Sequence, residues 1–269
     1  ALNGDGGDES FAGYERYSAM LMAEQYRRLP RSLRKSLIEG PIGLLPTSEL
    51  KRSRLRDAKR FLNAANLPRA QRYDRWMSAF DSDMKALIYT DDFRAQVGTA
   101  DNGILDKWFA RANGSGVLDA AMLTDQMTYL PNDLLVKVDI ASMANSLEAR
   151  SPFLDHNVIE FAASLPENLK MRRFETKSLL KKVAARLVPR EVVYRRKMGF
   201  GVPVGKWFRG EMKDFVRDTL LSPAALGRGI VKAEMIRKYV EEHIAGTRDH
   251  ASQIWTLLML ELWFQRFID

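Results

Sequence analysis

The chain has 269 residues, of which 46% are hydrophobic, and it carries a formal net charge of +8. This length and composition predict an ordinary soluble globular protein with one large or two small hydrophobic cores. Because the sequence has no cysteine, no apolar run of about 18 residues and no N-terminal signal-peptide pattern, it excludes disulfides and a membrane span and favours a cytoplasmic protein.

The chain opens with a loop rich in glycine and acidic residues. Glycines at positions 4, 6 and 7 permit positive φ values and allow backbone amides to approach an anion closely. Acids in such a loop repel bare phosphate, so Asp5 and Asp8 are interpreted as facing a metal or a cationic reactant. The alternative is a flexible loop that leads into an acidic helix N-terminus, where the acids complement the helix dipole.

Apolar residues at helical spacing predict a first helix over residues 8–28. Residues 40–46 are rich in glycine and proline and predict a turn, and Thr47 or Ser48 is expected to cap the helix that follows. We expect further helices over residues 32–39, 48–65, 72–80, 82–88, 91–97, 105–111 and 117–129.

Residues 130–155 combine apolar and charged positions more densely than packing alone requires. Lys137 and Asp139 flank a valine, and Glu148 and Arg150 end an apolar segment. Charges beside so much apolar surface are either paired internally or directed at a ligand. Asp155 is expected to cap a helix over residues 157–164.

Cations are prominent in the last third of the chain. Lys177 lies on a predicted helix over residues 175–187, and Lys197 opens a Gly-x-Gly-x-Pro loop that could lay an ammonium group over phosphate or form a basic surface turn. Helices are predicted over residues 207–221 and 231–244, and the nearly all-apolar run 254–267 predicts a buried helix. Overall, the chain is predicted to be overwhelmingly helical, with at most a short strand near its N-terminus.

The positive charge suggests an anionic partner, with basic clusters at residues 27–35, 51–60 and 195–197. Nearby acids and the lack of interleaved aromatic residues favour solvated helix faces over nucleic-acid binding, so no nucleic-acid partner is expected. The three histidines are far apart in the sequence, and any metal is therefore expected to be held by carboxylates and phosphate.

Three segments together resemble one enzyme family: residues 4–14, residues 130–155 and residues 197–203. The pattern is similar to the synthetase domain of glutamine-hydrolysing asparagine synthetases, and the last helix resembles the last helix of that family. The resemblance implies a parent domain of the α/β class, a Rossmann-like pyrophosphate-loop fold that binds its nucleotide at the carboxyl edge of a parallel sheet. Residues 1–269 would be the C-terminal portion of that domain.

The implied reaction is ATP-dependent amidation, catalysed by a carbon–nitrogen ligase. The aspartate carboxylate attacks the α-phosphorus of ATP, pyrophosphate leaves, and ammonia displaces AMP from the acyl-adenylate. Such chemistry needs Mg²⁺, fixed cations and a carboxylate that accepts a proton. The carried-over groups are, for catalysis, Asp5, Lys197 and Glu148; for ATP and pyrophosphate, Asn3, Gly4, Gly6, Gly7 and Lys177; for shaping the substrate end, Arg150 and Lys137; and for the metal, Asp8.

Departures from the family pattern limit what the chain is expected to do alone. Asn3 replaces a usual serine, and Ser10 replaces a usual apolar residue. The Ser-Gly-Gly-x-Asp-Ser pyrophosphate loop and the glutaminase domain, which lie upstream in the family, do not occur in the sequence. We therefore expect a fragment that binds ATP weakly or not at all and makes no product by itself, from a full-length protein compatible with a homodimer. Two alternatives stay open: a relative that amidates or cyclises another carboxylate, and a basic helical module that binds nucleic acid.

Overall fold

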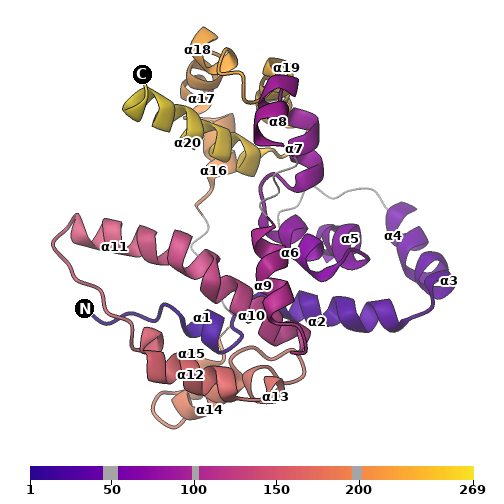
Figure 1. Ribbon diagram of the computed structural model, residues 1–269, viewed down its shortest axis with the longest axis vertical. Helices are drawn as coiled ribbons and strands as arrows, with labels where there is room; N and C mark the ends of the chain where they lie inside the picture. The colour runs from indigo at the N-terminus through magenta and orange to yellow at the C-terminus, as the bar shows by residue number, and fades with distance from the viewer. Residues whose placement is uncertain (45–53, 99–102, 196–201) are drawn as a thin grey trace. The chain divides into compact units, whose positions relative to one another are not determined.

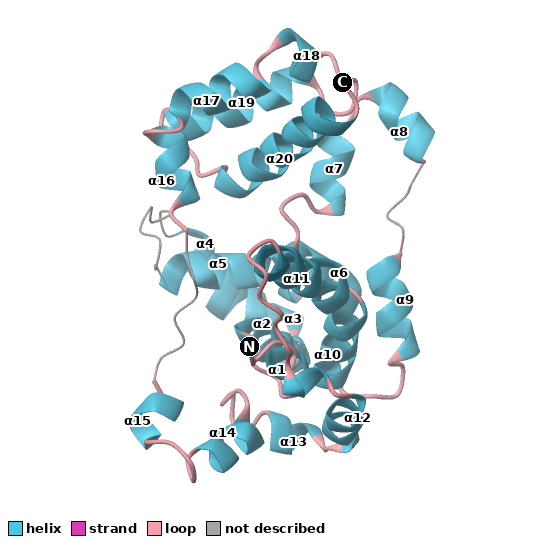
Figure 2. Cartoon of the chain, turned by 90° about the vertical axis from the view of Figure 1, so that its left-hand side faces the viewer, coloured by secondary structure: helices cyan, strands magenta, loops and turns pink. Residues whose placement is uncertain are grey.

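A computed structural model of the chain describes residues 1–44, 54–98, 103–195 and 202–269 (Figure 1). These residues form helices joined by loops, and Figure 2 shows no strand among them. The predicted helical character of the chain is therefore confirmed. No helix in this part of the chain is both long enough and apolar enough to span a bilayer.

The chain divides into two compact units. Unit 1 comprises Ala1–Trp76 and Gly103–Arg196, and unit 2 comprises Met77–Asn102 and Lys197–Asp269. In unit 1, α2 packs against both α5 and α10, and α1 contacts α10, α12 and η3. The elements of unit 1 are α1 Gly7–Ser10, α2 Glu15–Arg28, α3 Arg31–Leu33, the π-helix η1 Arg34–Glu39, α4 Gly40–Leu44, α5 Arg54–Ala65, α6 Arg69–Met77, α9 Ile104–Arg111, α10 Val117–Met127, the π-helix η2 Leu130–Leu134, α11 Leu135–Met143, the 3₁₀ helix η3 Pro152–Leu154, α12 His156–Ser164, α13 Glu167–Lys170, α14 Ser178–Ala184 and α15 Arg190–Val193.

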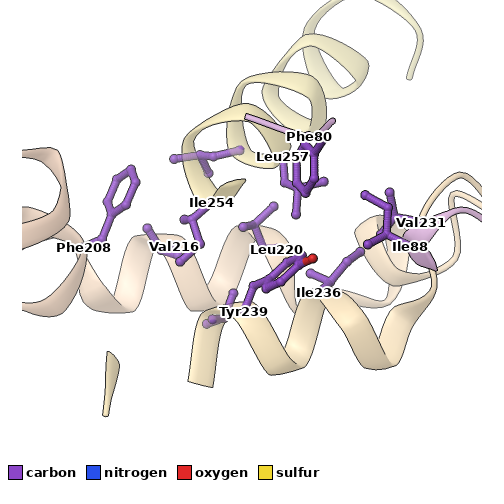
Figure 3. Close-up of a cluster of buried hydrophobic side chains, with 12 residues drawn as sticks. Phe80, Ile88, Phe208, Val216, Leu220, Val231, Ile236, Tyr239, Ile254 and Leu257 are labelled. Carbon is purple, nitrogen blue, oxygen red and sulfur yellow. The ribbon is translucent and has the colours of Figure 1, made fainter. Parts of the chain in front are cut away.

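Unit 2 has one hydrophobic core, shown in Figure 3. Its helices are α7 Ser82–Ile88, α8 Asp91–Val97, α16 Val204–Arg209, α17 Lys213–Leu220, α18 Pro223–Leu226, α19 Ala233–Ile244 and α20 Ala251–Phe267. The buried core residues are Phe80, Ile88, Phe208, Val216, Leu220, Val231, Ile236, Tyr239, Val240, Ile254, Leu257 and Leu258.

The prediction of a continuous helix over residues 8–28 is wrong. The segment divides into α1 and α2 because Ala12 takes a left-handed conformation, with φ of 57°. The break places the Phe11 ring edge-on to Phe153, with their centroids 6.0 Å apart. It also lets the Tyr14 hydroxyl donate a hydrogen bond back to Glu9. The turn therefore joins the glycine-rich loop to η3.

Several other helix boundaries follow local chemistry. The predicted helices at 82–88 and 91–97 are confirmed as α7 and α8, whose caps Asp81 and Thr90 accept hydrogen bonds from backbone amides. The expected cap at Asp155 is also confirmed, since its carboxylate accepts the Asn157 amide at 2.9 Å.

Other boundaries correct the sequence-based expectations. The predicted turn at 40–46 is wrong for its first part, because α4 continues the helix to Leu44. The single helix predicted over 207–221 is also wrong, since the chain breaks at Gly210 between α16 and α17. The expected cap at Thr47 or Ser48 lies outside the described residues.

The prediction that the final apolar helix is buried holds for only one of its faces. In α20, Ile254 and Leu258 lie in the unit 2 core. The opposite face exposes Trp255, Trp263 and Phe267, with 46%, 48% and 68% of their surface accessible. Composition could not separate the two faces because both are apolar.

His243 on α19 fixes the start of α16. It is fully buried, and its Nδ1 accepts the backbone N–H of His250 at 3.1 Å. Its Nε2 lies 3.0 Å from the Gly205 carbonyl oxygen, in the first turn of α16. Since Nδ1 accepts a hydrogen bond and so carries no proton, Nε2 carries the ring proton and donates it to the Gly205 carbonyl, which is the neutral Nε2–H tautomer.

Protonation of His243 is expected to destabilise unit 2. Burial lowers the pKa of His243 below its ordinary value of 6.5, so the unfolded chain binds its proton more readily than the folded chain does. The stability contributed by the neutral form is present above the unfolded pKa of 6.5 and is lost as the pH falls below it toward the lower pKa of the folded state. Urea unfolding across this range measures the loss. His243→Gln should flatten the dependence, whereas replacing the exposed His156 with glutamine should preserve it.

Candidate functional site

The N-terminal segment and the residues near 150 form a short parallel β-bridge between Leu2 and Arg150. The Asn3 N–H donates to the Arg150 carbonyl at 2.9 Å, and the Arg150 N–H donates to the Ala1 carbonyl at 2.8 Å. Parallel pairing of this kind requires a long connection, here the helices between the two segments. The bridge brings the glycine-rich loop and the 148–155 segment, separate in the sequence, to one place in unit 1.

Glycines in the loop are needed for packing against η3. Gly6 has φ of 81°, and a Cβ added there would collide with the Leu154 side chain. A Cβ on Gly7 would lie 3.2 Å from the Phe153 ring. At Gly4, by contrast, an added Cβ would have no atom within 4 Å. The positive φ expected for this loop is thus present at Gly6, while the space beside Gly6 and Gly7 is occupied by η3 and only Gly4 is open on its Cβ side.

Asp5 stands at an open pocket of about 390 Å³. Its Oδ2 accepts a hydrogen bond from Asn3 Nδ2 at 2.9 Å, and its carbonyl accepts one from the Ser151 hydroxyl. The pocket lies within unit 1 and is lined by Asn3, Asp5, Pro131, Leu135, Val136, Val138, Asp139, Ala149, Ser151 and Leu154. The predicted pair Asn3 and Asp5 is therefore brought to one concave surface, together with the 130–155 segment.

The two predicted charges Asp8 and Lys177 also meet. Asp8 Oδ1 lies 3.2 Å from Lys177 Nζ, and both side chains are about a quarter exposed, at 23% and 27%. Lys177 has an uncommon positive φ of 53° at the residue before α14, which turns the chain at this point. The predicted metal ligand and the predicted phosphate contact thus form an ion pair.

Glu148 and Arg150 form an ion pair with each other, which is one of the two alternatives expected of these charges. Arg150 Nε pairs with Glu148 Oε1 at 2.9 Å, and the two side chains are 74% and 66% exposed. Neither residue lines the pocket, whereas Ala149 and Ser151 do, as expected for alternation along an extended segment. Lys137 is exposed and likewise does not line the pocket, where Asp139 is found instead. Lys197 lies outside the described residues.

A buried polar network that sequence reasoning missed supports the loop. Asp125 on α10 has no exposed surface and accepts hydrogen bonds from Arg16, at 2.7 Å, and from the hydroxyls of Tyr17 and Tyr73. The Arg16 guanidinium lies 3.7 Å from the centre of the Tyr14 ring, in the range of a cation–π contact. The network ties the first turn of α2 to α6 and α10.

Glu9 lies next to this buried network and is only 1% exposed. It accepts the Tyr14 hydroxyl, and its carbonyl accepts Gln126 Nε2 at 3.1 Å. Burial raises the pKa of the Glu9 carboxyl above its ordinary value of 4.5. Glu9 is thus bound into the interior, while its neighbour Asp8 stays partly accessible.

Replacing Ser10 with alanine is expected to stabilise the protein by about 1 kcal/mol, because a buried polar group without a partner costs free energy. The Ser10 hydroxyl is 1% exposed and has no hydrogen-bond partner among the described residues. Urea unfolding measures the change. Ser164→Ala serves as the matched control, since that exposed hydroxyl donates to the Phe161 carbonyl at 2.7 Å. Loss of stability in the Ser10 variant would contradict the prediction.

The residues present fit a metal only together with a phosphate ligand. Among residues 1–44, 54–98, 103–195 and 202–269, no three histidine or acidic side chains gather closely enough to hold a metal ion. Asp8 would therefore supply only one carboxylate ligand to a metal ion. Mg²⁺ in nucleotide sites is commonly bound by one or two carboxylates together with phosphate oxygens and water, and Asp8 suits that donor set.

Comparison with known proteins gives a consistent result. Residues 1–265 match the family model described as asparagine synthase. The chain is 29% identical over 263 residues to asparagine synthetase [glutamine-hydrolyzing] 1 of Bacillus subtilis, which covers 98% of the chain and 40% of the relative. It is 31% identical over 273 residues to a Mycobacterium bovis protein that carries the asparagine synthetase name provisionally, covering 39% of that protein.

A more distant match is the amidase chyE of Penicillium rubens, at 22% identity over 90% of the chain and 38% of that protein. No solved structure shows a significant match. The chain spans about 40% of the length of each of these three relatives.

Proposed function

Because this chain belongs to the asparagine synthase family, we propose that residues 1–269 are the C-terminal part of the synthetase domain of a glutamine-hydrolysing asparagine synthetase. The observation that carries the proposal is that one short loop of unit 1 holds both Asp5, which lines the pocket, and Asp8, which pairs with Lys177. The upstream pyrophosphate loop and the glutaminase domain would belong to the remaining length of the protein.

In the proposed reaction, the side-chain carboxylate of aspartate attacks the α-phosphorus of ATP and pyrophosphate leaves. Ammonia then displaces AMP from the acyl-adenylate. Asp5 at the pocket would lie beside the reacting acyl group and accept a proton from the attacking ammonia. Lys177, next to Asp8, would contact phosphate, and Lys197 would neutralise the leaving group. When bound, Mg²⁺ would offset charge on the pyrophosphate, and Asp8 is the residue that would hold it.

Glu148 and Arg150 are proposed to shape the substrate end through their paired position beside the pocket wall rather than from within it. The Arg150 backbone forms one side of the bridge to Leu2, and the residues between and after Glu148 and Arg150, Ala149 and Ser151, line the pocket. A substitution of Glu148 would therefore change the position of the pocket wall formed by Ala149 and Ser151.

We also propose that the parent domain is an α/β fold with a parallel sheet. The parallel direction of the isolated bridge between Leu2 and Arg150 supports this, since all-parallel sheets occur almost only in α/β proteins, where helices cover both faces. Leu2 is 78% exposed, which fits an edge that further chain would cover. Figure 1 shows the N-terminal segment beside the chain that follows α11.

The test is pyrophosphate release by the full-length protein with Mg²⁺ and ATP, with glutamine or ammonia as nitrogen donor. Release that depends on aspartate is the expected result, and residues 1–269 alone are expected to release none. If another carboxylate supports release and aspartate does not, the protein is instead a relative that amidates or cyclises that acid. Absence of ATP-dependent release with every carboxylate would contradict the proposal.

A further inference from the structure

Gly13 is buried immediately after the turn between α1 and α2. Its φ is not positive, so its backbone conformation does not call for glycine. Its N–H donates to the Asp8 carbonyl at 2.8 Å, a bond that any residue except proline could make. The environment of the missing Cβ is the remaining reason for a glycine at this position.

That environment is formed by two charged side chains. A Cβ added to Gly13 would lie far inside contact distance of Asp8 Oδ1 and of Lys177 Cε, and 2.7 Å from Asp8 Cγ. Real Cβ atoms essentially never show a contact below 3.0 Å. The ion pair of Asp8 and Lys177 thus occupies the volume that any larger residue would claim.

We propose that Gly13 is a positioning residue whose missing side chain makes room for the Asp8–Lys177 ion pair. The functional meaning of this inference rests on the proposed function, in which Asp8 holds Mg²⁺ and Lys177 contacts phosphate. An alanine at position 13 would push the carboxylate and the lysine stem apart. The spacing of the two groups is therefore set by a residue that carries no functional group itself.

Backbone geometry supports a pair that is built rather than incidental. Ala12 and Lys177 both have positive φ, at 57° and 53°, conformations that are uncommon for residues with a Cβ. The left-handed conformation of Ala12 directs the chain into Gly13, and that of Lys177 orients the residue that supplies the ammonium group. Because both charged groups are still about a quarter exposed, a ligand in solution can reach them.

The first test measures the accessibility of the Lys177 amine in the full-length protein by its rate of acetylation with acetic anhydride, read by mass spectrometry. Gly13→Ala and Asp8→Ala should each raise the rate roughly two- to fivefold, as expected for loss of a partly exposed ion pair. The double variant should react no faster than Asp8→Ala. Lys182, which is exposed on α14, serves as the internal control with an unchanged rate. An unchanged Lys177 rate in Gly13→Ala would overturn the proposal.

The second test compares unfolding midpoints and can contradict the inference even if Gly13→Ala is strongly destabilised. In the Asp8→Ala background the contacts of the added Cβ with Asp8 Oδ1 and Cγ are gone, and the lysine stem, which has lost its partner, can move. Gly13→Ala should therefore lower the unfolding midpoint less in that background than in the parent. Equal losses in both backgrounds would show that the pair is not what Gly13 accommodates.

Pyrophosphate release separates this inference from the proposed function. If Gly13→Ala raises Lys177 labelling and also slows release, both stand. If labelling rises while release stays at the parent rate, the placement of the pair by Gly13 is supported, and the roles proposed for Asp8 and Lys177 are wrong.

Discussion

Replacing Asp125 with alanine is expected to lower the free energy of unfolding by about 3–5 kcal/mol, the cost of breaking a buried ion pair by removing one partner. Asp125 is fully buried, and its pair with Arg16 leaves the guanidinium only 14% exposed. The substitution would strand that cation together with the hydroxyls of Tyr17 and Tyr73, which also donate to Asp125. Urea unfolding of the full-length protein measures the loss.

Two variants calibrate this result. Tyr73→Phe removes one donor and keeps the charge pair, so we expect a smaller cost of about 0.5–1.5 kcal/mol. Asp91→Ala removes an exposed pair with Arg94, where the two side chains are 87% and 46% exposed, and should cost no more than about 1 kcal/mol. If Asp125→Ala cost no more than Asp91→Ala, the network would not be what holds α2 to α10.

Asp5→Ala in the full-length protein is expected to reduce ATP- and aspartate-dependent turnover by about 10²–10⁴-fold, the usual contribution of a positioned acid–base group. Asp5 is one of two carboxylates that line the pocket, the other being Asp139. Its position is held by Asn3 and by the Ser151 hydroxyl. Turnover is followed by pyrophosphate release and by formation of the amide product.

The matched control for Asp5→Ala is Asp133→Ala. Asp133 is an exposed acid on η2 that does not line the pocket, so its removal should leave turnover near the parent rate. Unfolding midpoints for both variants show whether any change in rate reflects loss of structure. A parent rate in Asp5→Ala would show that its proposed role is wrong.

Helical periodicity predicted most elements of the fold, and it succeeded best where capping residues marked the ends. α7 and α8 begin after Asp81 and Thr90, whose side chains accept backbone amides, and both helices have the predicted bounds. It failed at Ala12, because an alanine, and not the glycine that follows it, takes the left-handed conformation between α1 and α2. For α20, apolar residues on both faces removed the contrast that periodicity needs.

The candidate site shows a similar division. Family resemblance selected Asp5, Asp8 and Lys177, but no sequence pattern states that Asp8 and Lys177 lie 3.2 Å apart. The placement of Glu148 outside the pocket depends on the register of a segment that pairs with the N-terminus, and this long-range pairing cannot be read from the local sequence. Asp125 carried a readable signal, since it lies four residues after Ala121 and seven after Leu118, on the buried face of α10.

The order in which unit 2 is encoded has a consequence for its synthesis. Its core joins Phe80 and Ile88 to residues from 208 onward, while residues of unit 1 are encoded between them. On the ribosome, the apolar side chains of α7 emerge long before α17, α19 and α20, the helices that cover them. Uncovered apolar surface of this kind favours association with other chains and calls for chaperones. Unit 2 can therefore complete its core only after α20 has been translated, and a stop codon before α20 would remove Ile254, Leu257 and Leu258 from that core.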